Sequence, residues 1–360
     1  MITRLEIENF KAIKKVAIEL DPLTVLVGPN DSGKSTILQA LDLLSRSLDR
    51  PTYRPGEASV FDREPAESIH GGDRSKNITL RAEEVLRDGG SSLDLTFAYE
   101  ISFGFTKRVF GVVRESFAGL RGESVLDERY AEAPEYSYAS RNNDGDWASL
   151  RNELSSFLVA LEPKQLATPC RPDASFEPTG FGLAALVDRI LTDTDRAARD
   201  EYERALGSFS PHVASVGTRP VEGQLKELVF GLKDKTRVPA REASAGLLAT
   251  AGYLALMHLP ARRFLIEEPE NGLHPQALLN VADVLRGLPH KGRQVVMTTH
   301  SPILLNYIDA AHVRIVTRTT DEGVKVTPAL QSKVFNKLRQ KVDFGALWYS
   351  VGDDALASAQ

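Results

Sequence analysis

The stretch LVGPNDSGKST, residues 26–36, decides the fold of this chain. Gly28 is followed by four residues and then by Gly-Lys-Ser, which is the spacing of a loop that wraps the phosphates of a nucleotide. The residues just before it, LTVLVG at 23–28, form the apolar run of a buried strand. The residues just after it, STILQALDLLSRSL, carry apolar side chains at helical spacing. A phosphate-binding loop needs a strand and a helix on its two sides, so the sequence predicts a nucleotide site here.

The chemistry of the loop residues suggests a role for each. Gly28 and Gly33 let the backbone approach the phosphates without a side chain in the way. Lys34 would bridge the β- and γ-phosphates, the hydroxyl of Ser35 would hold Mg²⁺, and Thr36 would reach the α-phosphate. Backbone N–H groups and the start of the helix add partial positive charge. The expected ligands are therefore ATP and Mg²⁺.

Three more residues lie inside this loop. Asn30 and Ser32 are also expected to bind ATP. Asp31 lies between them and suits a left-handed backbone, which Asp and Asn tolerate best among the non-glycine residues. Because a carboxylate is repelled by phosphates, we expect the side chain of Asp31 to point away from the site.

A pair of glutamates follows a second apolar run, in FLIEEPENGLHP at 264–275. Ligands of parallel sheets bind at the carboxyl ends of the strands, so Glu267 and Glu268 would both reach the site from the frayed end of this strand. We expect Glu267 to act on Mg²⁺ through water, and Glu268 to orient or deprotonate the attacking water. The alternative is a solvated acidic loop, which the phosphate-binding loop upstream disfavours.

Two other segments offer polar groups. His300 comes directly after a buried strand in VVMTTHSP, so its ring would lie at the same sheet edge and could touch the γ-phosphate. Ser244 and Gly246 precede a long apolar helix, and a helix N-terminus can bind an anion. A structural role for His300 and a simple helix cap at Ser244 are the alternatives that these residues leave open.

The composition is that of a soluble globular protein, since 42% of the 360 residues are hydrophobic and 26% are charged. The net charge of −5 disfavours a broad nucleic-acid surface, so any DNA contact would be local. The single cysteine, Cys170, excludes a secreted disulfide scaffold. The longest apolar stretch is too short to span a bilayer, and the N-terminus lacks the apolar core of a signal peptide. We therefore expect a cytoplasmic protein with no membrane partner.

Strand-like and helix-like segments at both ends of the chain predict an α/β fold, with a parallel sheet and helices on both faces. Alternating segments predict a small antiparallel sheet, and they lie near 77–82, 93–102 and 108–114. Residues 120–148 are polar and rich in turn residues, whereas 149–208 have a helical pattern. The middle of the chain is thus expected to be an insertion.

These motifs resemble those of the ABC-type ATPases of the RecF and OLD branch. The segments that carry the resemblance are, in chain order, IENFKAI, GPNDSGKST, SAGLL, LIEEPENGLHP and TTHSP. The resemblance implies a P-loop ABC-type ATPase head with an antiparallel β subdomain and a mainly helical insertion. The expected boundaries are 1–118 for the N-terminal part of the head, 119–220 for the insertion, 221–330 for the C-terminal part of the head and 331–360 for a tail.

The family also implies roles at an interface. Its members bind ATP between two head-to-tail subunits, so Ser244 and Gly246 of one subunit would contact the γ-phosphate held by Lys34 of the other. His300 would match the switch histidine and Glu268 the catalytic glutamate.

Other positions match the family less closely. Lys11, in NFKAI, matches a basic position near the nucleotide. The signature ASAGL is shorter than the form found in transporters, and Glu267 stands where many relatives have aspartate. No glutamine of a Mg²⁺-sensing loop is identified, because Gln39 lies inside the first helix.

The leading interpretation is a slow ATPase that acts as a switch and controls an effector, a nuclease or toxin, in DNA repair or antiphage defence. Residues 301–360 are too few to hold the TOPRIM nuclease domain of OLD-type nucleases, so the effector is expected to be a separate polypeptide. The alternatives are an ATP-binding scaffold with little turnover and, less favoured by the signature, the ATPase subunit of a membrane transporter. DNA contact is possible through a basic cluster that is more often a solvated helix face: Lys333, Lys337, Arg339 and Lys341.

Overall fold

A six-stranded sheet forms the centre of the fold, in the order β15-β14-β3-β13-β12-β8. The computed structural model describes residues 1–48, 65–86, 95–106, 109–119, 124–129, 145–194, 196–319, 323–332 and 345. In sheet order the strands span Gly323–Pro328, Val313–Thr319, Leu23–Val27, Gln294–Thr298, Arg263–Glu267 and Ser156–Val159. Five of them are parallel, and only β15 runs antiparallel to its neighbour. The predicted parallel sheet is confirmed.

The two faces of this sheet belong to two different hydrophobic cores. Val25 and Val27 of β3 pack in one core, while Leu26 packs in the other. In β12, Leu265 likewise faces away from the core that holds its two neighbours. A strand covered on both faces needs apolar residues at every position, which explains why these strands appear in the sequence as unbroken apolar runs.

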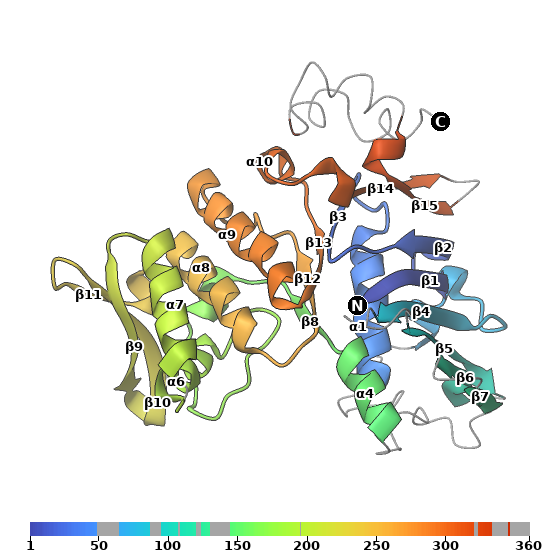
Figure 1. Ribbon diagram of the computed structural model, residues 1–360, viewed down its shortest axis with the longest axis horizontal. Helices are drawn as coiled ribbons and strands as arrows, with labels where there is room; N and C mark the ends of the chain where they lie inside the picture. Colours follow the sequence, from blue (N-terminus) through green and yellow to red (C-terminus); the bar gives the residue numbers. More distant parts are fainter. Residues whose placement is uncertain are drawn as a thin grey trace.

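Helices cover both faces of the central sheet, as predicted (Figure 1). Helix α1 (Lys34–Ser47) lies on one face, between the central sheet and the antiparallel sheet. Helices α8 (Ala245–Ala255) and α9 (Pro275–Gly287) lie on the other face. The remaining helices are α2 (Pro65–Ser68), α4 (Gly145–Leu154), α5 (Pro163–Leu166), α6 (Leu183–Thr192), α7 (Arg196–Phe209) and α10 (Pro302–Asn306).

The antiparallel subdomain is a second six-stranded sheet, in the order β2-β1-β4-β5-β6-β7. Its strands span, in chain order, Ile2–Phe10, Ile13–Glu19, Ile78–Leu86, Leu95–Thr106, Val109–Gly119 and Ser124–Arg129. The three alternating segments of the sequence are β4, β5 and β6, each longer than predicted. Hydrophobic residues of β1, β4 and β5 pack with those of α1 in one core, which joins this sheet to the central sheet.

The middle of the chain contains more strand than the sequence predicted. Strand β7 lies in the range expected to be turns, and β8 lies in the range expected to be helical. A three-stranded sheet, β11-β10-β9, adds Arg237–Pro239, Leu225–Leu232 and Val213–Val221. Because β8 pairs with β12, the segment 119–220 contributes a strand to the central sheet. The domain boundaries themselves stay a prediction.

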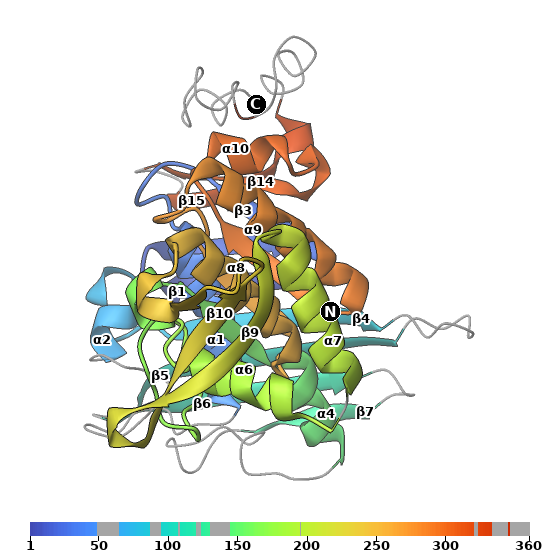
Figure 2. The ribbon, with the colours of Figure 1, turned by 90° about the vertical axis from the view of Figure 1, so that its left-hand side faces the viewer.

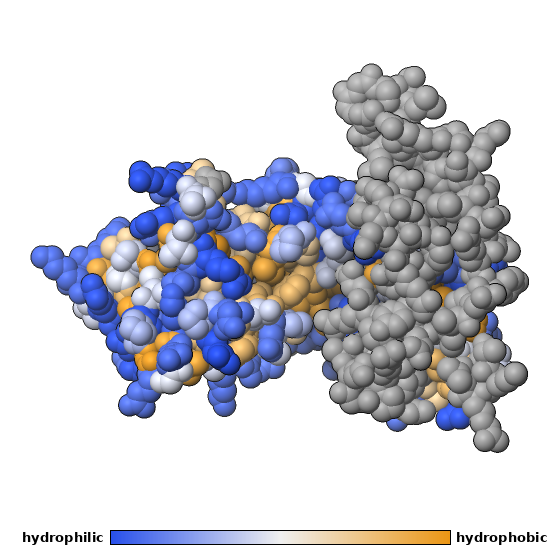
Figure 3. All heavy atoms as spheres, turned by 90° about the horizontal axis from the view of Figure 1, so that it is seen from below, coloured by the Kyte–Doolittle hydropathy of each residue, from blue (hydrophilic) through white to orange (hydrophobic). Residues whose placement is uncertain are grey.

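The three-stranded sheet lies at the outer end of the molecule, with α6 and α7 packed against it (Figures 1 and 2). Seen from below, the described surface is mostly hydrophilic, with apolar residues gathered in the hollow beside this end (Figure 3). No helix among the described residues is both long enough and apolar enough to cross a membrane.

Candidate nucleotide-binding site

A cavity of about 640 Å³ lies at the carboxyl edge of the central sheet. Its walls come from the β1–β2 turn, from the loops after β3, β12 and β13, and from the end of β14. The lining residues are Ala12, Asn30, Asp31, Gly33, Lys34, Ser35, Thr36, Glu268, His300 and Arg318. The structure therefore brings most of the predicted phosphate loop together with the predicted catalytic glutamate and switch histidine.

The loop after β3 gains its shape from close packing against the β14–β15 hairpin. A Cβ atom at Gly28 would lie 2.0 Å from the backbone oxygen of Val316, so only glycine fits. Gly33 has a φ of 106° and caps α1 without a side-chain hydrogen bond. A Cβ atom there would lie 3.1 Å from Val324. Asp31 has the left-handed backbone that its sequence suggested, with a φ of 62°. The residue is part of the cavity lining, whereas its side chain was expected to point away from the site.

The arrangement of donors fits a phosphate ligand. The N–H groups of the first turn of α1 have no partner within the helix, and they face the carboxyl edge of the sheet. Lys34 is 5% exposed, and its Nζ donates to the backbone oxygens of Gly28 at 2.8 Å and Pro29 at 2.7 Å. The hydroxyl of Ser32 is buried without a hydrogen-bond partner in the described part of the chain. Ser32 and Gly28 are not among the residues that line the cavity, so their assignment to ATP binding stays a prediction.

Glu268 is held at the cavity by contacts from three directions. Its N–H donates to the backbone oxygen of Thr298 at 3.2 Å, and Nδ2 of Asn271 donates to its Oε2 at 3.0 Å. Its φ of 43° is in the left-handed region, which is unfavourable for a residue with a side chain. Nε2 of His300 lies 3.6 Å from Oε1 of Glu268. The two predicted catalytic side chains are therefore neighbours.

The two predicted magnesium ligands are placed differently. Ser35 lines the cavity at the start of α1. Glu267 is the last residue of β12, paired in register with Thr298, and it is not among the lining residues. A hydroxyl and a carboxylate are oxygen ligands of the kind that Mg²⁺ prefers, so the donor chemistry fits the ion.

Lys11 lies in the turn between β1 and β2, where its neighbour Ala12 lines the cavity. Its φ is 49°, and its Nζ donates to Oε1 of Gln39 in α1 at 2.8 Å. The same Nζ lies 5.3 Å from the ring centre of Phe10. The lysine thus contacts α1 beside the nucleotide cavity, and its assignment to ATP binding stays a prediction.

Ser244 and Gly246 lie away from the cavity, at the start of α8. The exposed Ser244 caps this helix, because its hydroxyl accepts from the N–H of Leu247 at 3.3 Å. A Cβ atom at Gly246 would lie 2.6 Å from that of Ala277, so this glycine allows α8 and α9 to pack closely. Neither residue lines the cavity of its own chain.

Two residues at the site were given no role by the sequence analysis. Arg318 lines the cavity from the end of β14, and Asn271 holds the carboxylate of Glu268. Arg318 follows the apolar run of its strand, so its position at the carboxyl edge was the one clue that the sequence offered. The basic cluster at 333–341 lies outside the described residues.

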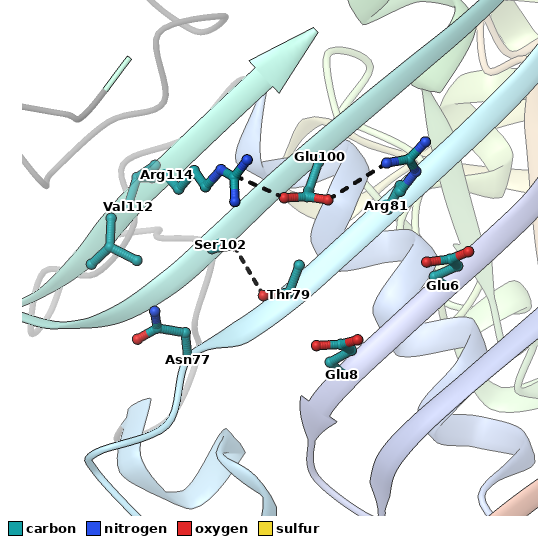
Figure 4. Close-up of a pocket in the computed structure, with 10 residues that line it drawn as sticks. Glu6, Glu8, Asn77, Thr79, Arg81, Glu100, Ser102, Val112 and Arg114 are labelled. Atoms are coloured by element: carbon teal, nitrogen blue, oxygen red, sulfur yellow. Dashed lines mark hydrogen bonds and ion pairs between the residues drawn. The ribbon is translucent and has the colours of Figure 1, made fainter. Parts of the chain in front are cut away.

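A second hollow, of about 600 Å³, lies on the outer face of the antiparallel sheet (Figure 4). Among its charged groups, Arg81 and Arg114 both lie within 4 Å of Glu100. Glu6 and Glu8 pair with Arg4 and Lys15, which are outside the lining. Thr79 and Ser102 share a hydrogen bond of 2.9 Å on the same face (Figure 4). This pattern is that of a solvated sheet face, and it adds nothing to the nucleotide site.

Comparison with known proteins identifies relatives over most of the chain. Residues 1–168 match a family model described as "AAA ATPase domain", and residues 180–306 match one described as "AAA domain, putative AbiEii toxin, Type IV TA system". The chain is 48% identical over 365 residues to the OLD nuclease of Thermus scotoductus. The alignment covers 91% of this chain and 64% of that protein. It is 22% identical over 378 residues to the Old nuclease of Escherichia phage P2, which covers 86% and 58%.

Among solved structures, the fold is similar to that of an SMC head. A crystal structure of the SmcHead bound to the C-winged helix domain of ScpA aligns with a TM-score of 0.56 and 16% identity, and covers 91% of this chain and 97% of that one. Two ATPase-domain models together cover most of the chain, and with the identity to the OLD nuclease they support an ABC-type ATPase of the OLD and RecF branch. The fold is that of a P-loop ATPase head, as the sequence predicted. It spans 64% and 58% of the lengths of the two nucleases.

Proposed function

We propose that the chain is a Mg²⁺-dependent ATP-binding and ATP-hydrolysing switch that controls an effector. One observation carries the proposal: a single cavity is lined by the phosphate loop, by Glu268 and by His300. The family supports the ATPase part, because both matching models are ATPase domains.

Binding would use groups that already face the cavity. Backbone N–H groups at the start of α1 and the side chains of Lys34 and Thr36 would hold the phosphates. Lys34 would exchange its present bonds to the Gly28 and Pro29 oxygens for bonds to phosphate oxygens. Asn30 would contact the nucleotide from the mouth of the same loop. Mg²⁺, when bound, would neutralise phosphate charge, with Ser35 and Glu267 as the residues that hold it.

Hydrolysis would be assisted by the neighbouring pair at the far wall. A water oxygen forms a bond to the γ-phosphorus, the bond from that phosphorus to the bridging oxygen breaks, and Glu268 accepts the proton of the water. The ring of His300 would hydrogen-bond the γ-phosphate. Asn271 keeps the glutamate oriented through its contact with Oε2.

The switch would require a second subunit. Ser244 and Gly246 lie at the exposed start of α8, outside the cavity of their own chain. In a head-to-tail homodimer they would complete the site of the partner by contacting the γ-phosphate. ATP would then stabilise the closed dimer and hydrolysis would release it, since only a ligand with different affinities for two states shifts their populations.

The effector is proposed from the names of relatives. Two similar proteins are named OLD nuclease, so a nuclease is the leading class of effector, and DNA the leading final target. Repair and antiphage defence are the processes that we propose for the switch. That the effector is a separate polypeptide stays a prediction.

The test is ATP turnover and ATP binding measured on the same variants. Glu268→Gln should lower kcat about 100-fold or more, because it removes the proton acceptor, and should leave ATP affinity within about twofold. Lys34→Ala should abolish ATP binding. An exposed α9 variant, Asp283→Ala, should match the wild type in both measurements. A wild-type chain that binds ATP but turns over no faster than Glu268→Gln would instead support the scaffold interpretation.

A further inference from the structure

The carboxylate of Glu270 joins the two loops that carry the proposed catalytic side chains. It comes two residues after Glu268, in the loop that follows β12. Its Oε1 accepts a hydrogen bond from Oγ1 of Thr299 at 2.8 Å and another from the N–H of His300 at 2.6 Å. Both donors lie in the loop after β13. One oxygen atom therefore ties the glutamate loop to the histidine loop.

The strands alone leave this geometry open. Strands β12 and β13 are parallel neighbours, and their last pair in register is Glu267 with Thr298. Beyond that pair, the loops after β12 and β13 are no longer paired as strands. The position of His300 therefore depends on other contacts. Its N–H is held by Glu270, and the next N–H, of Ser301, is held by Oγ1 of Thr299 at 3.0 Å.

The other carboxylate oxygen of Glu270 is buried and makes no hydrogen bond to the described part of the chain. Within the described part of the chain, all the polar contacts of this side chain are therefore directed to the histidine loop. A carboxylate that makes its hydrogen bonds to one loop fixes that loop strongly, because bonds to a charged acceptor are stronger than neutral ones. Fixing the backbone at His300 fixes the start of its side chain, whose Nε2 lies 3.6 Å from Oε1 of Glu268.

We propose that Glu270 is a positioning residue, which holds His300 in register with Glu268 for ATP hydrolysis. The inference rests on the proposed function, and it assigns Glu270 no contact with ATP. Because the Glu270 carboxylate acts as a hydrogen-bond acceptor, the amide oxygen of a glutamine at this position should perform the same role. A misplacement of about 1 Å can cost about 100-fold in rate, so loss of the acceptor should act on turnover rather than on binding.

The test compares Glu270→Ala, Glu270→Gln and the control Asp283→Ala in the full chain. We expect Glu270→Ala to lower kcat about 10- to 100-fold with ATP affinity within about twofold of the wild type. Glu270→Gln should stay within about threefold of the wild-type kcat, because its amide oxygen can accept both bonds. Equal kcat for Glu270→Ala and the wild type would overturn the proposal. So would a Glu270→Gln variant as slow as Glu270→Ala.

A second readout separates this proposal from the proposed function. The NMR signal of the His300 ring, assigned with His300→Gln, should move in Glu270→Ala and stay in place in Glu270→Gln and Asp283→Ala. This holds even if the wild type hydrolyses no ATP, a result that would overturn the proposed function alone. An unmoved His300 signal in a folded Glu270→Ala variant would overturn the positioning role.

Discussion

Some of the side chains that line the cavity belong to the sequence motifs, and others, such as Arg318, lie outside them. Lys34, Glu268 and His300 each follow an apolar strand, and parallel strands bring their carboxyl ends to one edge. Arg318 lies near the end of a fourth strand of the same sheet, β14. It places a positive charge at a cavity that Asp31 and Glu268 also line.

Arg318 should therefore strengthen ATP binding. We predict that Arg318→Gln weakens ATP about tenfold, because a hydrogen bond to a charged group contributes about 1.5–3 kcal/mol. AMP, with fewer phosphates, should lose less affinity. Isothermal titration with both nucleotides measures this, with Arg286→Gln on the outer part of α9 as the control. Equal affinities for ATP in Arg318→Gln and the wild type would exclude the contact.

Sequence reasoning reached the motif residues and stopped there for a physical reason. The spacing around Gly28 and Lys34 is local, so one stretch of chain contains the whole signal. The contacts of Asn271 and Glu270 depend on which loop lies beside them in space. Their motif, EEPEN, shows the residue types but not that one amide and one carboxylate turn back toward Glu268 and His300.

At the scale of elements, the β14–β15 hairpin forms the back of the phosphate loop. The backbone of Val316 contacts Gly28, the side chain of Val324 contacts Gly33, and Arg318 enters the cavity from the same hairpin. The loop and the hairpin are almost 300 residues apart in sequence. The shape of the phosphate loop thus depends on an element far from its own motif.

The stability of the fold should decrease in acid because of a histidine, His258, just after α8. His258 ends the short helix that follows α8, and its ring lies 6.0 Å from that of Tyr202 in α7. Burial lowers the pKa of His258, while the charge of Asp193 partly opposes that effect. As the pH falls through the ordinary histidine pKa, about 6.5, the unfolded chain takes up the proton more readily than the folded one. Stability is therefore lost below that pH and unaffected above it.

We predict that the free energy of unfolding of the wild type falls between pH 7 and pH 5 more steeply than that of His258→Gln. Urea unfolding at the two pH values measures both slopes. Glutamine stays neutral throughout, so the difference between the two proteins reports this one ring. Identical slopes would show that burial of this ring has no effect on proton uptake.

The elements that the sequence missed share one property: their local pattern is ambiguous. Strand β8 has four residues, Ser156–Val159, and so short an apolar run fits a helix as well as a strand. Strand β9 contains Pro220, which is tolerated because the strand lies at the edge of its sheet. Strand β8 is decided by pairing with β12, which is distant in sequence, and β9 is decided by pairing with the next strand, β10. The strands β3, β12 and β13 were predicted correctly, because each is a buried apolar run directly before a recognisable motif.

At the scale of the whole molecule, the two halves of the proposed site lie on different parts of the surface. The cavity opens at the carboxyl edge of the central sheet, whereas the start of α8 lies outside it with Ser244 exposed. A single chain therefore offers a γ-phosphate site and a separate contact for another one. A head-to-tail pair would use both, which is the central claim of the proposed switch.

The most direct measurement is the ATPase rate of two inactive variants expressed together. Lys34→Ala and Ser244→Arg should each be inactive alone, since each spoils both sites of a dimer. In a mixed dimer one site combines the intact Lys34 of one chain with the intact Ser244 of the other. Random pairing should then restore about one quarter of the wild-type rate. Full activity of Ser244→Arg alone, or a folded mixture that stays inactive, would contradict the account.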